Sequence, residues 1–293
     1  MMSMKEQIMV IYRLTYMKKT LFVVALILMT VNASAWTRLG HAVVAKIAED
    51  HLTPVAKAKV YEYLNGESMV RHASYADDFG NVNKDLKVNY TEFSGGKYEG
   101  IDNYPHVITV DENGELLNDW HPYGGNARFF IERYLDELKH PENLKPDEIW
   151  WRIVYITHVM GDFHCPVHIM WSHLPKEKNL GHCKVLYRGE VKSYHYVWDR
   201  YMIEIPMPYS FSDIAWLIDT FTPEQIAEFT KGDLCDWAKD SALASKHVLD
   251  VKDGDKIEKG DLYYERRFIE TQLCKGGYRL AKMFNDVFDP QNQ

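Results

Sequence analysis

Histidine and aspartate recur four residues apart in two separate places of this sequence. His158 and Asp162 form the first pair, His195 and Asp199 form the second, and His168 follows the first pair closely. Residues four apart share one face of a helix, and imidazole nitrogens and carboxylate oxygens both bind zinc. The two pairs and His168 are therefore five candidate ligands for a metal ion.

The surroundings of the first pair favour a metal over a simple hydrogen bond. The stretch before it is apolar and includes Trp150, Ile153 and Val154, so we expect the pair to be buried. A buried ionised carboxylate needs a compensating partner, which a metal ion provides. A single such pair is more simply interpreted as a hydrogen bond on a helix surface. Two pairs on apolar backgrounds shift the interpretation to a metal site.

Three further side chains extend the candidate set, although each has an ordinary explanation on its own. His41 lies near the expected start of a helix, Asp77 lies beside Asp78, and His106 lies in a strand-like segment. Taken singly, a helix-start histidine, a solvated aspartate pair and a core-edge histidine are the better interpretations. His121 is an alternative to His106, and Asp78 is an alternative to Asp77.

Helices are expected to position most of these residues. Apolar residues at helical spacing, with caps such as Thr53-Pro54 and Thr222-Pro223, predict helices at residues 40–52, 54–64, 124–139, 147–163, 234–249 and 262–286, and one beginning near 223. Strand-like pieces are short, at residues 104–110 and 183–191. The fold class predicted is all-α, with a single mostly helical domain and short β hairpins.

The first 35 residues are predicted to be a secretory signal peptide. Lys18 and Lys19 precede an apolar run at residues 21–29, and Ala33-Ser34-Ala35 follows as a cleavage site. The run is too short to span a bilayer, which takes about 20 residues, and no stop-transfer pattern supports an uncleaved anchor. We expect residues 1–16 to be an extension before a true start at Met17. Residues 36–293 then form the domain, and the protein is secreted or periplasmic.

Charge and cysteine content limit how this chain can bind a partner. It has 34 Lys and Arg against 42 Asp and Glu, and cleavage after Ala35 leaves 30 against 41. An acidic protein does not attract polyanions through its overall field, so nucleic acid would need a local positive charge such as bound metal. The four cysteines, Cys165, Cys183, Cys235 and Cys274, form no CxxC pair. A cysteine zinc knuckle is therefore not expected, and export permits disulfides whose pairing stays open.

The order of these motifs resembles a known family. The motifs are a Trp-x4-His at Trp36, Ser74-Tyr75-Ala76-Asp77, the lone His106, the His158-x3-Asp162-x5-His168 run and the His195-x3-Asp199 pair. Together they resemble the single-strand-specific zinc nucleases of the P-one/S-one family, in the phospholipase C superfamily. The resemblance runs from Trp36 to about Phe288 and rests on the combination, because no single motif is specific.

The resemblance implies three zinc ions per chain, held in a cleft of a mostly helical domain. The ligands that it implies are Asp77, His106, His158 and Asp162 for the first zinc; His168, His195 and Asp199 for the second; and Trp36 and His41, with Asp162 shared, for the third. Trp36 would bind through its α-amine and carbonyl oxygen, so removal of the signal peptide would create a ligand.

The resemblance further implies an exported endonuclease that cuts single-stranded DNA or RNA to 5′-phosphorylated products and removes 3′-phosphate from nucleotides. Asp77 and Asp162 would be catalytic through zinc-bound water, and we expect a monomer. The chain departs from the family's pattern in four places: Val107 replaces a common aromatic, Leu180-Gly181-His182 replaces a common Gly-Gly-Asn, Arg200 follows the last aspartate, and Cys165 replaces a common glutamine. Val107 and Arg200 are candidate substrate contacts. Cys165 could touch a zinc, but it is interpreted as a packed or disulfide-bonded thiol, because the ligand set is already full.

Two other functions are compatible with the same ligands. A zinc phospholipase C would use the same metal chemistry on a lipid phosphodiester, but that branch typically ends in a His-x3-Glu pair where this chain has Asp199. A non-catalytic zinc-binding protein is the second alternative. An open coordination position distinguishes a catalytic zinc from a structural one.

Overall fold

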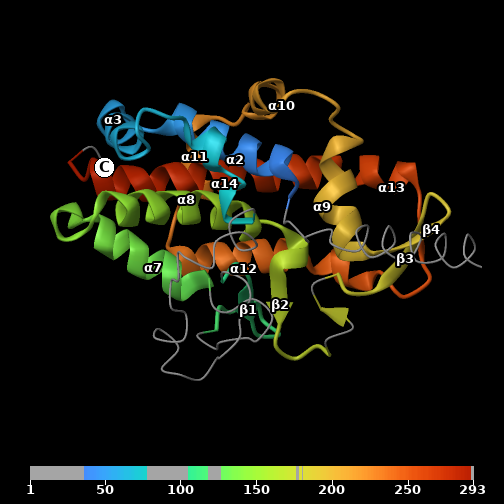
Figure 1. The fold of residues 1–293 in the computed structure, drawn as a ribbon. Coiled ribbons are helices and arrows are strands. Elements are labelled where there is room, and N and C mark those ends of the chain that lie inside the picture. The colour runs from blue at the N-terminus through green and yellow to red at the C-terminus, as the bar shows by residue number, and fades with distance from the viewer. Residues whose placement is uncertain (1–35, 78–104, 118–126, 176–177, 180, 292–293) are drawn as a thin grey trace, which may run out of the picture. The chain divides into compact units, whose positions relative to one another are not determined.

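The computed structural model describes residues 36–77, 105–117, 127–175, 178–179 and 181–291 (Figure 1). The predicted signal peptide, residues 1–35, lies outside the described residues, as do the alternative ligands Asp78 and His121. The helices are α2 (Arg38–His51), α3 (Pro54–Tyr63), α4 (Met69–His72), α7 (Ala127–Leu138), α8 (Pro146–Asp162), α9 (Tyr194–Glu204), α10 (Phe211–Ile218), α11 (Pro223–Phe229), α12 (Leu234–Ala244), α13 (Lys259–Tyr264) and α14 (Arg266–Phe288). None of the helices among the described residues combines the length and the apolar character that a membrane span requires.

Helices α2, α8 and α14 form the centre of the core. Figure 1 shows α14 in red alongside α2 in blue and α8 in green, and each of the three contacts the other two. The α2–α14 contact is close, because a Cβ on Gly277 would lie 2.5 Å from Cγ2 of Ile47. Fully buried side chains such as Val44, Ile153 and Leu280 fill the contacts. The all-helical framework predicted from apolar spacing is confirmed.

Two helix boundaries differ from the prediction, whereas the cap of α3 agrees with it. The Thr53 hydroxyl accepts a hydrogen bond from the Ala56 amide at 3.2 Å, as its place before Pro54 predicts. The helix predicted at 262–286 is two helices, α13 and α14, with Glu265 between them. The one predicted at 234–249 ends at Ala244 and continues as a 3-10 helix, η4 (Lys246–Asp250). Apolar residues continue at helical spacing across both breaks, so their pattern does not show where the helices end.

The strands are short, and one pairing differs from the expected hairpins. Strands β3 (Lys184–Tyr187) and β4 (Glu190–Ser193) form the predicted antiparallel hairpin, and β5 (Lys256–Ile257) adds to β3 in parallel. Strands β1 (Ile108–Val110) and β2 (Ile169–Trp171), however, pair in parallel. Parallel neighbours need a long crossover, and here the chain between them contains α7, the 3-10 turn η1 (Pro141–Asn143), α8 and the turn η2 (Pro166–His168). Residues that precede β1 and β2 therefore meet at one edge.

Candidate metal centre

The C-terminal turn of α8 carries the first His–Asp pair into a buried cluster with α2. His158 and Asp162 are fully buried, as is His41 on α2. The rings of His41 and His158 stack with their centroids 3.9 Å apart. Oδ1 of Asp162 lies 3.4 Å from Nε2 of His41, and its Oδ2 lies 3.5 Å from Nε2 of His158. One carboxylate thus faces two imidazoles, at a helix end where the backbone dipole favours a cation.

Asp77 joins this cluster from the segment that follows α4. Its Oδ1 lies 3.4 Å from Nε2 of His158. Nδ1 of the same ring lies 2.7 Å from the carbonyl oxygen of Ala73, which fixes the ring so that Nε2 points to the carboxylates. Ligand atoms of His41, Asp77 and His158 all lie within 4.8 Å of one another. A contact between Nδ1 and a carbonyl is the usual support of a metal-binding histidine.

The second His–Asp pair meets His168 and His106 beside the parallel strands. His106 precedes β1 and His168 precedes β2, so the parallel register brings the centroids of their rings to 5.2 Å from each other. The ring of His195 on α9 lies 4.8 Å from that of His168. Asp199, one turn further along α9, places Oδ2 3.1 Å from Nε2 of His195 and Oδ1 4.0 Å from Nε2 of His168.

Trp36 lies at the N-terminal end of α2, against α9. It is fully buried, and its ring packs 6.3 Å from that of Trp198. The next amide, of Thr37, donates a 2.7 Å hydrogen bond to the carbonyl oxygen of Asp199. Gly40 makes room for this packing, because a Cβ there would lie 2.7 Å from Cβ of Trp36. The backbone of Trp36 is thereby placed beside the second pair.

The donors of this region fit a divalent metal. Among the described residues, neither oxygen of Asp162 and neither ring nitrogen of His168 has a hydrogen-bond partner, although both residues are buried. Buried polar atoms without partners are costly, and a bound cation would compensate for them. Imidazole and carboxylate donors together suit zinc. The structure thus contains groups able to hold zinc ions, as expected for a zinc-dependent enzyme.

Several of the candidate ligands have raised pKa values, so a metal would displace protons from them. Burial raises the pKa of Asp162 well above its usual value. Burial lowers the pKa of His158, but the carboxylates of Asp77 and Asp162 outweigh it and raise that pKa to about 9. Burial also raises the pKa of Asp199 to about 6, against the opposing effect of His195.

We therefore expect zinc binding at pH 7.5 to release at least one proton, and zinc affinity to fall as the pH falls from 9 to 5. Zinc affinity falls with falling pH because the metal binds the deprotonated ligands, whereas the raised pKa values keep these ligands protonated at lower pH. Calorimetric zinc titrations in two buffers of different ionisation enthalpy measure the release. Binding without proton release at pH 7.5, or affinity independent of pH, would contradict this assignment.

Gly161, next to Asp162, leaves the space that His41 occupies. A Cβ on Gly161 would lie 2.6 Å from Nδ1 of His41, whereas one on Gly276 would meet its nearest neighbours at 3.4 Å. We expect Gly161→Ala to displace His41, to weaken zinc binding and to lower activity at least tenfold. Gly276→Ala is the matched control, since both changes improve helix propensity by about 1 kcal/mol. Zinc content and turnover are measured for both; equal values would contradict the role given to Gly161.

The two predicted substrate contacts differ in their surroundings. Val107 is only 2% exposed and packs against Met170, so it offers no open surface on which a base could lie. Arg200 is exposed on α9, with its guanidinium 6.0 Å from the ring centres of Tyr196 and Tyr201. In the described part of the chain no ion pair to a carboxylate is found for Arg200. It therefore remains a candidate for holding a phosphate.

Cys165 lies nearer to the predicted ligands than the favoured interpretation as a packed or disulfide-bonded thiol implies. Its sulfur, with ligand atoms of His168 and Asp199, forms a group in which all atoms lie within 4.8 Å of one another. The four cysteines are free thiols in the structure. The signal in the sequence for this contact is the short spacing Cys165-x2-His168.

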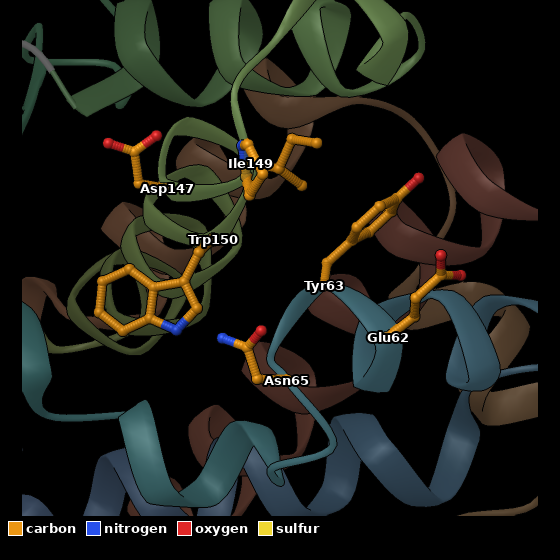
Figure 2. A pocket seen from close by; sticks show the side chains of 7 residues that line it. Glu62, Tyr63, Asn65, Asp147, Ile149 and Trp150 are labelled. Atoms are coloured by element: carbon orange, nitrogen blue, oxygen red, sulfur yellow. The ribbon is translucent and has the colours of Figure 1, made fainter.

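A pocket of about 500 Å³ lies apart from these ligands, between α3 and the start of α8 (Figure 2). Figure 2 shows the rings of Trp150 and Tyr63 on either side of it. Its lining residues are Glu62, Tyr63, Asn65, Pro146, Asp147, Ile149 and Trp150. Two carboxylates and no basic side chain line this pocket, so it is unsuited to a phosphate.

The sequence of this chain matches one known family and individual proteins over most of its length. The family model for S1/P1 nuclease matches residues 36–289. Nuclease P1 from Penicillium citrinum is 23% identical over 283 residues, covering 86% of this chain and 97% of that protein. Endonuclease 2 from Arabidopsis thaliana is 21% identical over 281 residues, covering 88% and 92% respectively. The match thus extends over nearly all of the described chain.

Proposed function

This chain belongs to the S1/P1 nuclease family, and on that basis we propose that it is an exported nuclease that uses three zinc ions to hydrolyse single-stranded DNA or RNA. Its products would carry 5′-phosphates, and it would also remove 3′-phosphate from nucleotides. That the chain is a phosphodiester hydrolase follows from the family itself. The zinc number, the preference for single strands, the second activity and export are the parts proposed here.

The position of Asp162 is the observation that supports the site most directly. Its two oxygens face two different imidazoles, of His41 and His158, and neither has a hydrogen-bond partner in the described residues. A carboxylate so placed can be shared between two metal ions. Zinc bound there would supply a water of lowered pKa as nucleophile and would polarise the phosphate.

Side chains around the site have separate roles in this proposal. Ala73, through its carbonyl, orients the ring of His158, and Asp77 and Asp162 both face Nε2 of that ring. The acidic chain lacks an overall field that attracts a polyanion, so an exposed cation near the ligands would bind substrate. Arg200 directly follows the ligand Asp199 and is exposed, and its guanidinium can donate two hydrogen bonds to one phosphate.

Export is supported by where the ligands begin. The family match starts at Trp36, the residue that would follow cleavage after Ala35. Trp36 is buried, and the amide of the next residue, Thr37, donates a hydrogen bond to the carbonyl oxygen of Asp199. We propose that cleavage frees the α-amine of Trp36 as a zinc ligand. Family membership favours this nuclease over the phospholipase C alternative.

A substrate panel tests the proposed function. The processed protein is given single-stranded DNA, duplex DNA, RNA, a 3′-nucleotide and phosphatidylcholine, before and after zinc is removed with a chelator and restored. We expect hydrolysis of both single strands and of the 3′-nucleotide, lost without zinc and regained with it. Hydrolysis of phosphatidylcholine alone would establish the lipid activity instead. Full zinc binding with no turnover of any substrate would establish a non-catalytic zinc protein.

Arg200→Ala is expected to raise KM for oligonucleotides and to weaken the dependence on salt. Loss of one phosphate contact reduces the slope of log affinity against log salt by about 0.7 for single strands. Arg267→Ala is the control, because it removes the same charge from an exposed side chain that is paired with Glu270. KM is measured for homopolymers at several salt concentrations. Equal slopes for the two variants would show that Arg200 does not contact phosphate.

A further inference from the structure

The thiol of Cys165 is directed into the group of buried donors around His168. Cys165 is fully buried, and its sulfur lies within 4.8 Å of ligand atoms of both His168 and Asp199. His168 is 1% exposed, and neither of its ring nitrogens has a hydrogen-bond partner in the described residues. The cysteine is thus accompanied by an independent sign of a missing ligand, namely a buried imidazole without a hydrogen-bond partner among the described residues.

The local backbone holds Cys165 and His168 on one tight turn. Cys165 caps η2, and the amide of His168 donates a 3.0 Å hydrogen bond to the Cys165 carbonyl. Pro166 begins this turn and restricts its backbone. The amide of Cys165 in turn donates to the carbonyl of Asp162 at 2.9 Å. Two donors separated by two residues on a fixed turn have a spacing common in zinc sites.

We propose that the Cys165 thiolate is a further ligand of the metal that His168 and Asp199 hold. The thiol proton leaves to solvent as the metal–sulfur bond forms. With His195 from the same helix as Asp199, this centre then has four protein donors, the number found in closed, tightly held zinc sites. The inference rests on the proposed metal site, but not on the reaction or its substrate.

A sulfur donor would set this centre apart from the one around Asp162, whose donors are nitrogen and oxygen. Thiolates favour soft metals, whereas carboxylates favour hard ones. We therefore expect this centre to be the last to lose its metal to a chelator and to bind Cd²⁺ more tightly, relative to Zn²⁺, than a Cys165→Gln variant does. A thiol that only fills space would have neither effect.

Cys274 provides a matched control for a buried thiol without metal. It is also fully buried, on α14, where its Sγ donates to the carbonyl oxygen of Ile218 at 3.4 Å. Removing either sulfur leaves a small cavity in the interior, so both alanine variants are expected to lose comparable stability. A difference in metal spectrum between them therefore reports ligation and not packing.

The test uses protein isolated with its metals, together with Cys165→Ala and Cys274→Ala. Zinc is replaced by Co²⁺, and the thiolate-to-cobalt charge-transfer band in the near ultraviolet is recorded. We expect the band in the unmodified protein and in Cys274→Ala. In Cys165→Ala we expect the band to be absent and one metal equivalent to be lost on dialysis against a chelator. Absence of the band from unmodified protein, or its persistence in Cys165→Ala, would overturn the inference.

X-ray absorption of the unmodified zinc protein keeps the inference testable if Cys165→Ala does not fold. A zinc–sulfur distance of about 2.3 Å is resolved from zinc–nitrogen distances of about 2.0–2.1 Å. Zinc bound without any sulfur scattering would overturn this inference and leave the proposed nuclease standing. Failure to bind zinc at all would overturn both, so the two failures are distinguishable.

Discussion

Asp162→Asn is expected to lower kcat/KM on single-stranded DNA at least 100-fold, and by more than Asp77→Asn or Asp199→Asn. Oδ1 of Asp162 faces His41 and its Oδ2 faces His158, so we expect its loss to perturb two metals. Asp77 approaches the cluster through Oδ1, 3.4 Å from Nε2 of His158, and we expect its loss to perturb one. Loss of metal stabilisation of a transition state amounts to several kcal/mol, and about 3 kcal/mol is a factor of roughly 100. Turnover and zinc content of the three variants measure the order.

The same substitution is expected to leave the metal-free protein at least as stable as before. Burial raises the pKa of Asp162, so its charged form is disfavoured without metal and an uncharged amide of the same shape does not add to that cost. Asp240→Asn is the contrasting control, because Asp240 is paired with Arg279 and Lys275 and its loss should lower stability without removing zinc. Near-normal turnover and full zinc content in Asp162→Asn would refute the shared-ligand assignment.

Adding one residue before Trp36 is expected to lower activity at least tenfold while the fold is retained. The extension converts the α-amine, which we propose as a zinc ligand, into an amide, which is a poor one. Trp36 is buried and held against α9 through Thr37 and Trp198, so the remaining contacts keep the segment in place. Activity, zinc content and circular dichroism are measured on protein with and without an initial Met.

A removable extension separates the loss of the amine from the effect of added bulk. A variant carrying a protease site directly before Trp36 is assayed before and after cleavage. Recovery of activity and of one zinc equivalent on cleavage is expected. Equal specific activity before and after cleavage would show that the amine is not a ligand, and the other predicted ligands would be unaffected by that result.

Periodic patterns in the sequence predicted α2 and α8, which carry part of the site, but the helix α9 was not among the predicted helices. His158 and Asp162 lie on one face because they are four apart, and the same spacing places His195 and Asp199 together on α9. Local patterns of this kind depend only on helix geometry. The breaks at Glu265 and Ala244 were not predicted, because apolar residues continue across them and tertiary packing decides where a helix ends.

The types of donor and their pairing along helices can be read from the sequence, since both follow from residue identity and local spacing. Which pairs share a site depends instead on tertiary contacts. The parallel pairing of β1 with β2 brings His106 to His168, and close packing of α2 on α8, which Gly161 permits, brings His41 to His158. Tertiary packing also buries Val107 and brings the sulfur of Cys165 close to His168. These contacts join residues far apart in the chain, so no local pattern specifies them.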